Sequence, residues 1–286
     1  MAGVKLLRKG FSLAFAAALL SAACGQVESA ALETFISCTG VLEQGGAVLC
    51  STVPNASVEI GDVKTMSDEQ GHVLIGFDRD APTHETITVT AVGANPHSQT
   101  LTIKSREFGV QRIDGLPPSQ VSNFTKQQLA RIRASSARKK IGFASRETAM
   151  GFRDGFVLPV EGTKTSDFGN QRILNGVPKR PHYGVDIAAP VGTPIYAPAD
   201  GVVSLADDDL YFEGAMVLLD HGQGLISMYL HMSDIIVEPG QKIKRGDKIG
   251  EVGAKGRVTG PHLCWRLKWR NRNLDPELLT RWPTDE

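Results

Sequence analysis

No net charge is left over in this sequence, because its 286 residues include 31 Lys and Arg and 31 Asp and Glu. Binding to nucleic acid or to an anionic membrane surface through a general positive field therefore has no support. A bilayer-spanning helix needs roughly 20 apolar residues, and the apolar run from Phe11 to Leu20 is about half as long. We therefore expect no permanent membrane span. With 41% hydrophobic residues, the chain can bury a sizeable core, and its length allows two folded units.

Residues 1–23 have the pattern of an export signal. A positively charged lead precedes the apolar run, and the small residues 21–23 follow it directly before Cys24. Two kinds of processing fit this pattern: cleavage by ordinary signal peptidase, or a bacterial lipoprotein signal in which Cys24 accepts a lipid. We expect an exported protein of the periplasm or cell envelope, whose only membrane contact, in the second case, is the lipid on Cys24.

Cysteine is scarce, with four residues in the chain. In an oxidising compartment Cys38 and Cys50 are close enough in sequence to bridge two neighbouring strands, and we predict a disulfide between them. Since Cys24 belongs to processing, Cys264 has no partner. It is either a small buried hydrophobic residue or a metal ligand.

Short alternating segments separated by Gly, Pro, Asn and Asp fill residues 33–105 and predict a small antiparallel β domain of the sandwich kind. The region contains no catalytic grouping, and we interpret its histidines as surface or strand residues. The segments expected as strands are Ser57 to Ile60, His72 to Phe77, Glu85 to Ala91 and Thr100 to Ile103.

Residues 117–150 read as a helical connector, which Asn123 or Thr125 can cap and which runs toward Ala149. Its cations form either a solvated helix face or a contact with anionic envelope polymers. These cations are Arg131, Arg133, Arg138, Lys139 and Lys140.

Residues 152–286 return to strands with many tight turns, so the fold class is mainly β.

Two pairs of chemically active residues have spacings that place each pair on one face of a strand. His182 and Asp186 point the same way across Gly184, which we expect to leave open space between them. His262 and Cys264 share a face in the same manner, while Leu263 and Trp265 lie on the other face.

A further histidine, His231, follows a hairpin turned at residues 221–224, and we expect it at the end of the return strand. Imidazole, carboxylate and thiolate are all ligands of zinc, and a catalytic zinc site uses three protein ligands plus water. Bound zinc activates that water, and two nearby histidines can move protons or stabilise an oxyanion.

Four segments run in the order seen in lysostaphin-type, or LytM-like, peptidases: HYGVDIAAPVGTPIYAPADGVV, DHGQGLISMYLHMS, VEPGQKIKRGDKIGEVG and GRVTGPHLCW. The resemblance covers about residues 155–275. It implies a compact β core of the duplicated-hybrid-motif kind, with a narrow groove for peptide.

The resemblance also implies roles for single residues. His182 and Asp186 match zinc ligands, and His231 and His262 match the catalytic pair. Cys264 stands where the family has its third ligand, a His. A thiolate can bind zinc in that place, although its negative charge makes zinc a weaker Lewis acid.

The function expected from the resemblance is a zinc endopeptidase that cuts peptide cross-links of cell-wall peptidoglycan. One alternative is a degenerate, noncatalytic module that binds and activates another wall hydrolase, which metal content would discriminate. A second alternative is a sugar-phosphotransferase or biotinyl-like carrier of related β architecture, but export and the clustered histidines argue against it.

Overall fold

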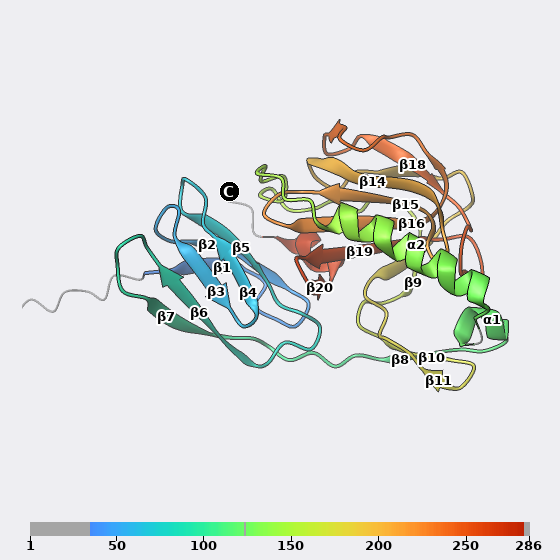
Figure 1. The fold of residues 1–286 in the computed structure, drawn as a ribbon, viewed down its shortest axis with the longest axis horizontal. Helices are drawn as coiled ribbons and strands as arrows, with labels where there is room; N and C mark the ends of the chain where they lie inside the picture. Colours follow the sequence, from blue (N-terminus) through green and yellow to red (C-terminus); the bar gives the residue numbers. More distant parts are fainter. Residues whose placement is uncertain (1–34, 123, 283–286) are drawn as a thin grey trace, which may run out of the picture. The chain divides into compact units, whose positions relative to one another are not determined.

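Strands are more common than helices in the computed structural model, which describes residues 35–122 and 124–282 (Figure 1). The export signal at residues 1–23 and the possible lipid acceptor Cys24 lie outside the described residues. Among the described helices, none is long and apolar enough to cross a membrane.

Two antiparallel sheets form the N-terminal part. Residues that alternate between buried and exposed, such as those of Ser57–Ile60, give each sheet one apolar face, and Val48, Val58, Val73 and Val89 from the two sheets belong to one buried cluster. The predicted antiparallel β region is therefore confirmed. One sheet holds β1 (Ser37–Gly40), β2 (Ala47–Ser51) and β5 (His72–Gly76); the other holds β3 (Ser57–Ile60), β4 (Val63–Met66), β6 (His84–Thr90) and β7 (His97–Thr102).

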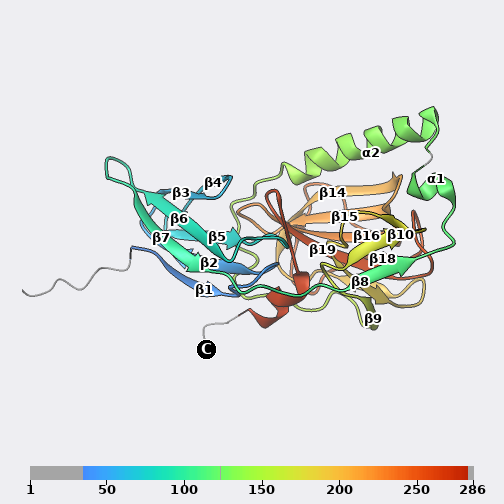
Figure 2. The same cartoon turned by 90° about the horizontal axis from the view of Figure 1, so that it is seen from below.

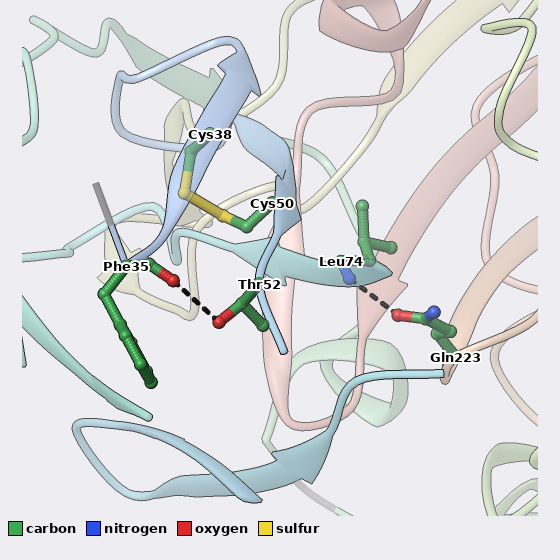
Figure 3. The surroundings of a disulfide bond; sticks show 6 residues. All are labelled: Phe35, Cys38, Cys50, Thr52, Leu74 and Gln223. Atoms are coloured by element: carbon green, nitrogen blue, oxygen red, sulfur yellow. Dashed lines mark hydrogen bonds between the residues drawn. A yellow bond between two sulfur atoms is a disulfide. The ribbon is translucent and has the colours of Figure 1, made fainter. Parts of the chain in front are cut away.

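The predicted disulfide between Cys38 and Cys50 is present and joins β1 to β2 (Figure 3). The two cysteines are directly opposite each other in the antiparallel register, with Cα atoms 4.0 Å apart. The bridge therefore closes a short loop within one sheet.

The connector contains two helices, α1 (Pro118–Val121) and α2 (Lys126–Phe143). Thr125 caps α2, because its side-chain hydroxyl accepts a hydrogen bond from the backbone N–H of Gln128. In return, the Gln128 side chain accepts a hydrogen bond from the backbone N–H of Thr125. The helix ends at Phe143, earlier than the predicted Ala149. In Figures 1 and 2, α2 lies along β14 (Gly201–Leu210), and a Cβ on Gly142 would come within 2.9 Å of Leu205 there.

A ten-stranded sheet forms the C-terminal part. Its main path runs β17-β14-β15-β16-β19-β12-β9, and the wholly buried Tyr229, Trp265 and Trp269 fill its core. The hairpin turn predicted at residues 221–224 joins β15 to β16. The further strands are β9 (Thr163–Ser166), β12 (Val185–Ala188), β13 (Pro194–Tyr196), β15 (Gly214–Asp220), β16 (Leu225–Ile235), β17 (Lys242–Ile243), β18 (Lys248–Val252), β19 (Leu263–Trp269) and β20 (Arg272–Leu274), followed by the 3-10 helix η1 (Pro276–Arg281).

A small fourth sheet links the segment before α1 to the C-terminal part. Its order is β11-β10-β8, with β8 (Val110–Ile113) parallel to β10 (Gln171–Leu174), which pairs with β11 (Val177–Pro178). Figure 2 shows β8 and β10 side by side. This sheet was not predicted, and it brings residues 110–113 beside the candidate site.

Candidate metal centre

His182, Asp186 and Cys264 converge on one point. Asp186 on β12 is the direct register partner of Cys264 on β19, and His182 lies just before β12. The Nε2 atom of His182 is 3.1 Å from Asp186 Oδ1 and 3.3 Å from Cys264 Sγ. All three residues are buried, and their potential ligand atoms lie within 4.8 Å of one another, so the group can hold a metal ion.

Gly184 has a different role from the one expected. It does not leave open space, because a Cβ there would lie 2.6 Å from the backbone oxygen of Trp265 and 2.4 Å from Arg266 Cγ. The glycine is needed for close approach of the chain to β19. His182 and Asp186 still meet, since the approach brings the start of β12 against β19.

The protonation states of this group suit a cation. Burial opposes ionisation of Asp186, but contact with His182 and the charge of Arg172 hold its pKa below the usual range. Burial lowers the pKa of His182 to about 4 and raises the pKa of the Cys264 thiol to about 12. At neutral pH the site therefore offers a carboxylate, a neutral imidazole and a thiol.

A metal ion would provide the bonding partner that Asp186 Oδ1 lacks. Asp186 Oδ1 is buried and accepts no hydrogen bond from the described residues, although His182 Nε2 is near. The other imidazole nitrogen, Nδ1, is 3.0 Å from Ser166 Oγ. With the proton on Nδ1, the lone pair on Nε2 faces the carboxylate and the sulfur, an arrangement that a cation stabilises.

Two arginines contact the group, and neither was among the predicted site residues. Arg172 on β10 donates to Asp186 Oδ2 over 3.2 Å, and Arg266 donates through Nε to Cys264 Sγ over 3.2 Å. Strand alternation, which paired His262 with Cys264, also places Arg266 on that face. Arg172 had no such signal because it comes from the small sheet.

His231 lies inside a strand and not at its end, which corrects the expectation. The strand β16 continues to Ile235, and the register with β15 shifts at His231, whose φ is +68°. It is the extra residue of a β-bulge, in a left-handed conformation that is uncommon outside glycine and recurs at functional sites.

Each of the two remaining histidines has its Nδ1 beside a carbonyl oxygen. His231 Nδ1 is 2.8 Å from Lys255 O, and His262 Nδ1 is 2.9 Å from Gly260 O. Because a carbonyl only accepts, both Nδ1 atoms carry protons. Burial lowers the pKa of His231 to about 3, so its Nε2 has a free lone pair at neutral pH. The two ring centroids are 4.9 Å apart.

A cavity of about 360 Å³ opens onto these residues. Asp186, Cys264, His231 and His262 all line it, and His262 Nε2 is 3.7 Å from Asp186 Oδ1. The structure thus brings every predicted site residue together. One wall was not foreseen, because it is built by residues of β8 and the following turn: Gln111, Ile113 and Leu116.

Comparison with known proteins places this region in a family. Residues 180–276 match the model of peptidase family M23. This segment is an M23 peptidase domain. A crystal structure of “putative peptidase M23” from Pseudomonas aeruginosa is 28% identical with a TM-score of 0.65, and the match covers 83% of this chain and 94% of that chain. The likeness to this M23 structure therefore extends beyond the matched segment.

Two relatives of the chain have informative names. Peptidoglycan DD-endopeptidase ShyA of Vibrio cholerae is 46% identical over 113 residues, which are 39% of this chain and 26% of that protein. A Haemophilus influenzae protein named uncharacterized metalloprotease is 39% identical over 97 residues, 34% of this chain and 20% of that protein. The match spans about a quarter or less of the length of these relatives.

Proposed function

We propose that the protein is a zinc-dependent endopeptidase that hydrolyses peptide cross-links of peptidoglycan in the periplasm or cell envelope. One observation carries the proposal. Three buried groups able to ligate zinc, from His182, Asp186 and Cys264, lie beside two histidines with fixed Nδ1 protons, and four of these five residues line one cavity.

The protein groups have complementary roles in the proposed reaction. When bound, zinc lowers the pKa of a coordinated water toward about 7 and polarises a carbonyl. His231 is unprotonated on Nε2 and held by Lys255 O, so it can accept a proton without reorienting. Between them, His231 and His262 take a proton from the attacking water and give one to the leaving amine.

The substrate class rests on the relatives and on the chain's chemistry. ShyA, to which 113 residues of this chain are 46% identical, is named a peptidoglycan DD-endopeptidase. The Cys38–Cys50 disulfide is typical of proteins outside the reducing cytoplasm. Peptidoglycan also lies outside the cytoplasm. Both observations support a wall peptide as the substrate.

The test is zinc analysis of the purified full chain, followed by digestion of isolated peptidoglycan and separation of the released peptides. We expect one zinc per chain and cleavage of cross-links. Replacing His231 or His262 with Ala should lower turnover by about 10²-fold or more while zinc stays bound. His84→Ala is the matched control, because His84 is exposed and lies on β6.

Two outcomes would contradict this proposal. If the parent protein holds zinc and cleaves no cross-link, the domain is a noncatalytic module that acts on another hydrolase. If His231→Ala and His262→Ala both keep full activity, the assigned residues do not carry the chemistry.

A further inference from the structure

Three cations of α2 have different surroundings from the cations at the end of the helix. These three cations are ion-paired with acidic residues of the neighbouring β14–β15 hairpin, which offsets their charge. These pairs are Arg131–Asp209, Arg138–Asp207 and Lys139–Glu213. A solvated helix face and a polymer contact were the two predicted alternatives for the cations of the connector. Neither describes these three ion-paired residues.

The second group lies where α2 ends and faces the β19–β20 hairpin. Lys140 and Arg146 from the helix side and Lys268 and Arg270 from the hairpin line one groove of about 520 Å³. None of the four forms an ion pair with a carboxylate of the described residues. We call this surface the basic groove, and its members are Lys140, Arg146, Lys268 and Arg270 together with Phe143 and Asn271.

The one carboxylate that lines the basic groove is already engaged. Asp62 accepts from Asn271 over 2.6 Å and lies 3.5 Å from Arg272. The cations also crowd one another: burial and then the charge of Arg146 lower the pKa of Arg270. A bound anion would relieve this repulsion between like charges.

Arg270 is held in a costly position. It is the first residue of the two-residue turn between β19 and β20, with φ at +51°, where Asn, Asp or Gly is usual. Its Nε is buried and has no hydrogen-bond partner among the described residues. Beside it, Lys268 Nζ lies 5.3 Å from the centroid of the Phe143 ring, so the groove combines cations with an apolar ring face.

From this combination we propose that the basic groove is a second, noncatalytic binding site for the wall, which takes a carboxylate-bearing segment of a peptidoglycan strand. The four cations, which have no carboxylate partner among the described residues, complement the carboxylates of a wall peptide, and their shallow, open groove accommodates an extended chain segment. Phe143, which is only partly buried, adds an apolar surface beside the four cations. The proposal rests on the envelope location given under the proposed function, and it does not require peptidase activity.

The experiment measures binding of the full chain to isolated peptidoglycan by co-sedimentation, with zinc chelated so that nothing is cleaved. The test variant is Lys268→Gln with Arg270→Asn, because Asn tolerates the left-handed turn position. The matched control is Arg131→Gln with Arg133→Gln, which removes two charges elsewhere on α2. We expect the test variant to bind roughly tenfold more weakly and the control to bind like the parent.

Two further measurements separate the possible explanations. Zinc-loaded test variant should cleave a small soluble cross-linked wall peptide at the parent rate, since the substituted residues do not line the catalytic cavity. Binding to vesicles of anionic lipid should be the same for parent and test variant. Equal binding of parent and test variant to peptidoglycan, an equal loss in the control, or a loss confined to the lipid vesicles would each overturn the proposal.

Discussion

Cys264 differs from the other two proposed ligands in the proton that it carries. At neutral pH Asp186 is ionised and His182, whose pKa is about 4, is neutral, so neither has a proton to lose. The buried thiol has a pKa of about 12 despite its contact with Arg266. Zinc ligation requires the thiolate, and the metal must therefore displace one proton from Cys264.

We predict that zinc binding to the metal-free protein releases about one proton, and that affinity rises about tenfold for each pH unit between about 6 and 8. The sign follows from competition, since protons and zinc compete for the sulfur and raising the pH removes the competitor. Calorimetric titration in buffers with different ionisation enthalpies measures the proton count.

Cys264→His is the control for this proton count. An imidazole is mostly neutral above about pH 7, so proton release should fall close to zero there while zinc still binds. Equal proton release from the parent and the Cys264→His variant would mean that the proton comes from another group.

At the scale of elements, β20 ties the peptidase region to the N-terminal sheets through a buried arginine. Arg272 donates to Glu85 Oε2 over 2.8 Å and to the backbone oxygens of Gly76 and Ile60 over 3.0 Å. Both charged side chains are more than nine-tenths buried. A second contact, from Gln223 in the β15–β16 turn to Leu74 N, appears in Figure 3.

Replacing Arg272 with Met should lower the free energy of unfolding by about 3 to 5 kcal/mol, because it leaves the Glu85 carboxylate buried without a partner. Denaturant unfolding of the zinc-loaded protein measures this. Arg272→Met combined with Glu85→Leu should recover much of the loss. A single-variant effect below about 1 kcal/mol, the usual value of exposed pairs such as Lys64–Glu59, would refute the role given to this contact.

Local sequence patterns predicted individual helices and strands, but they did not predict which distant strands pair with each other. Alternation and turn residues gave β3 in full, and Thr125 was one of two predicted caps. The pairing of β8 with β10 could not be read from either strand, because their residues are about sixty positions apart and register is set by tertiary packing. Arg172 was missed for the same reason, since β10 carries it to Asp186.

The candidate site was largely predictable because its ligands have local spacing. Period-two alternation places His262 and Cys264 on one face, and the resemblance supplied the remaining roles. The local backbone conformation around these residues could not be predicted from the sequence. The bulge at His231 and the close approach at Gly184 both depend on neighbouring strands.

At the scale of the whole molecule, the residues from Phe35 onward form one compact unit. The predicted division into a sandwich at 33–105, a connector at 117–150 and a peptidase domain at 152–286 stays a prediction. The contacts of Arg272 cross the first of those boundaries. We therefore expect one unfolding transition in calorimetry, and two separate transitions would favour independent domains.

Acid should destabilise this unit through buried histidines. His221 is wholly buried, donates from Nδ1 to Asp200 O and lies 2.7 Å through Nε2 from Ser227 Oγ, and burial lowers its pKa to about 4. Below the unfolded value of about 6.5, the unfolded chain binds a proton that the folded chain excludes. The contribution of His221 to stability is therefore complete above about pH 6.5 and is lost as the pH falls toward 4.

We predict that this one residue makes the free energy of unfolding fall by about 1.4 kcal/mol per pH unit across the middle of that window. Denaturant titrations of metal-free protein from about pH 7 to pH 4.5 measure the slope. His221→Asn should reduce the slope by about that amount, and the exposed His84→Asn should leave it unchanged. A slope that His221→Asn does not alter would show that His221 takes up its proton in the folded state.

The proposed function depends on His182, Asp186 and Cys264 binding one zinc ion together. Zinc K-edge X-ray absorption of the reconstituted full chain tests it most directly, because sulfur and the lighter ligands scatter differently. We predict one sulfur at about 2.3 Å and nitrogen or oxygen ligands at about 2.0 to 2.2 Å. A spectrum with no sulfur neighbour, or a protein that retains no stoichiometric zinc, would contradict the claim.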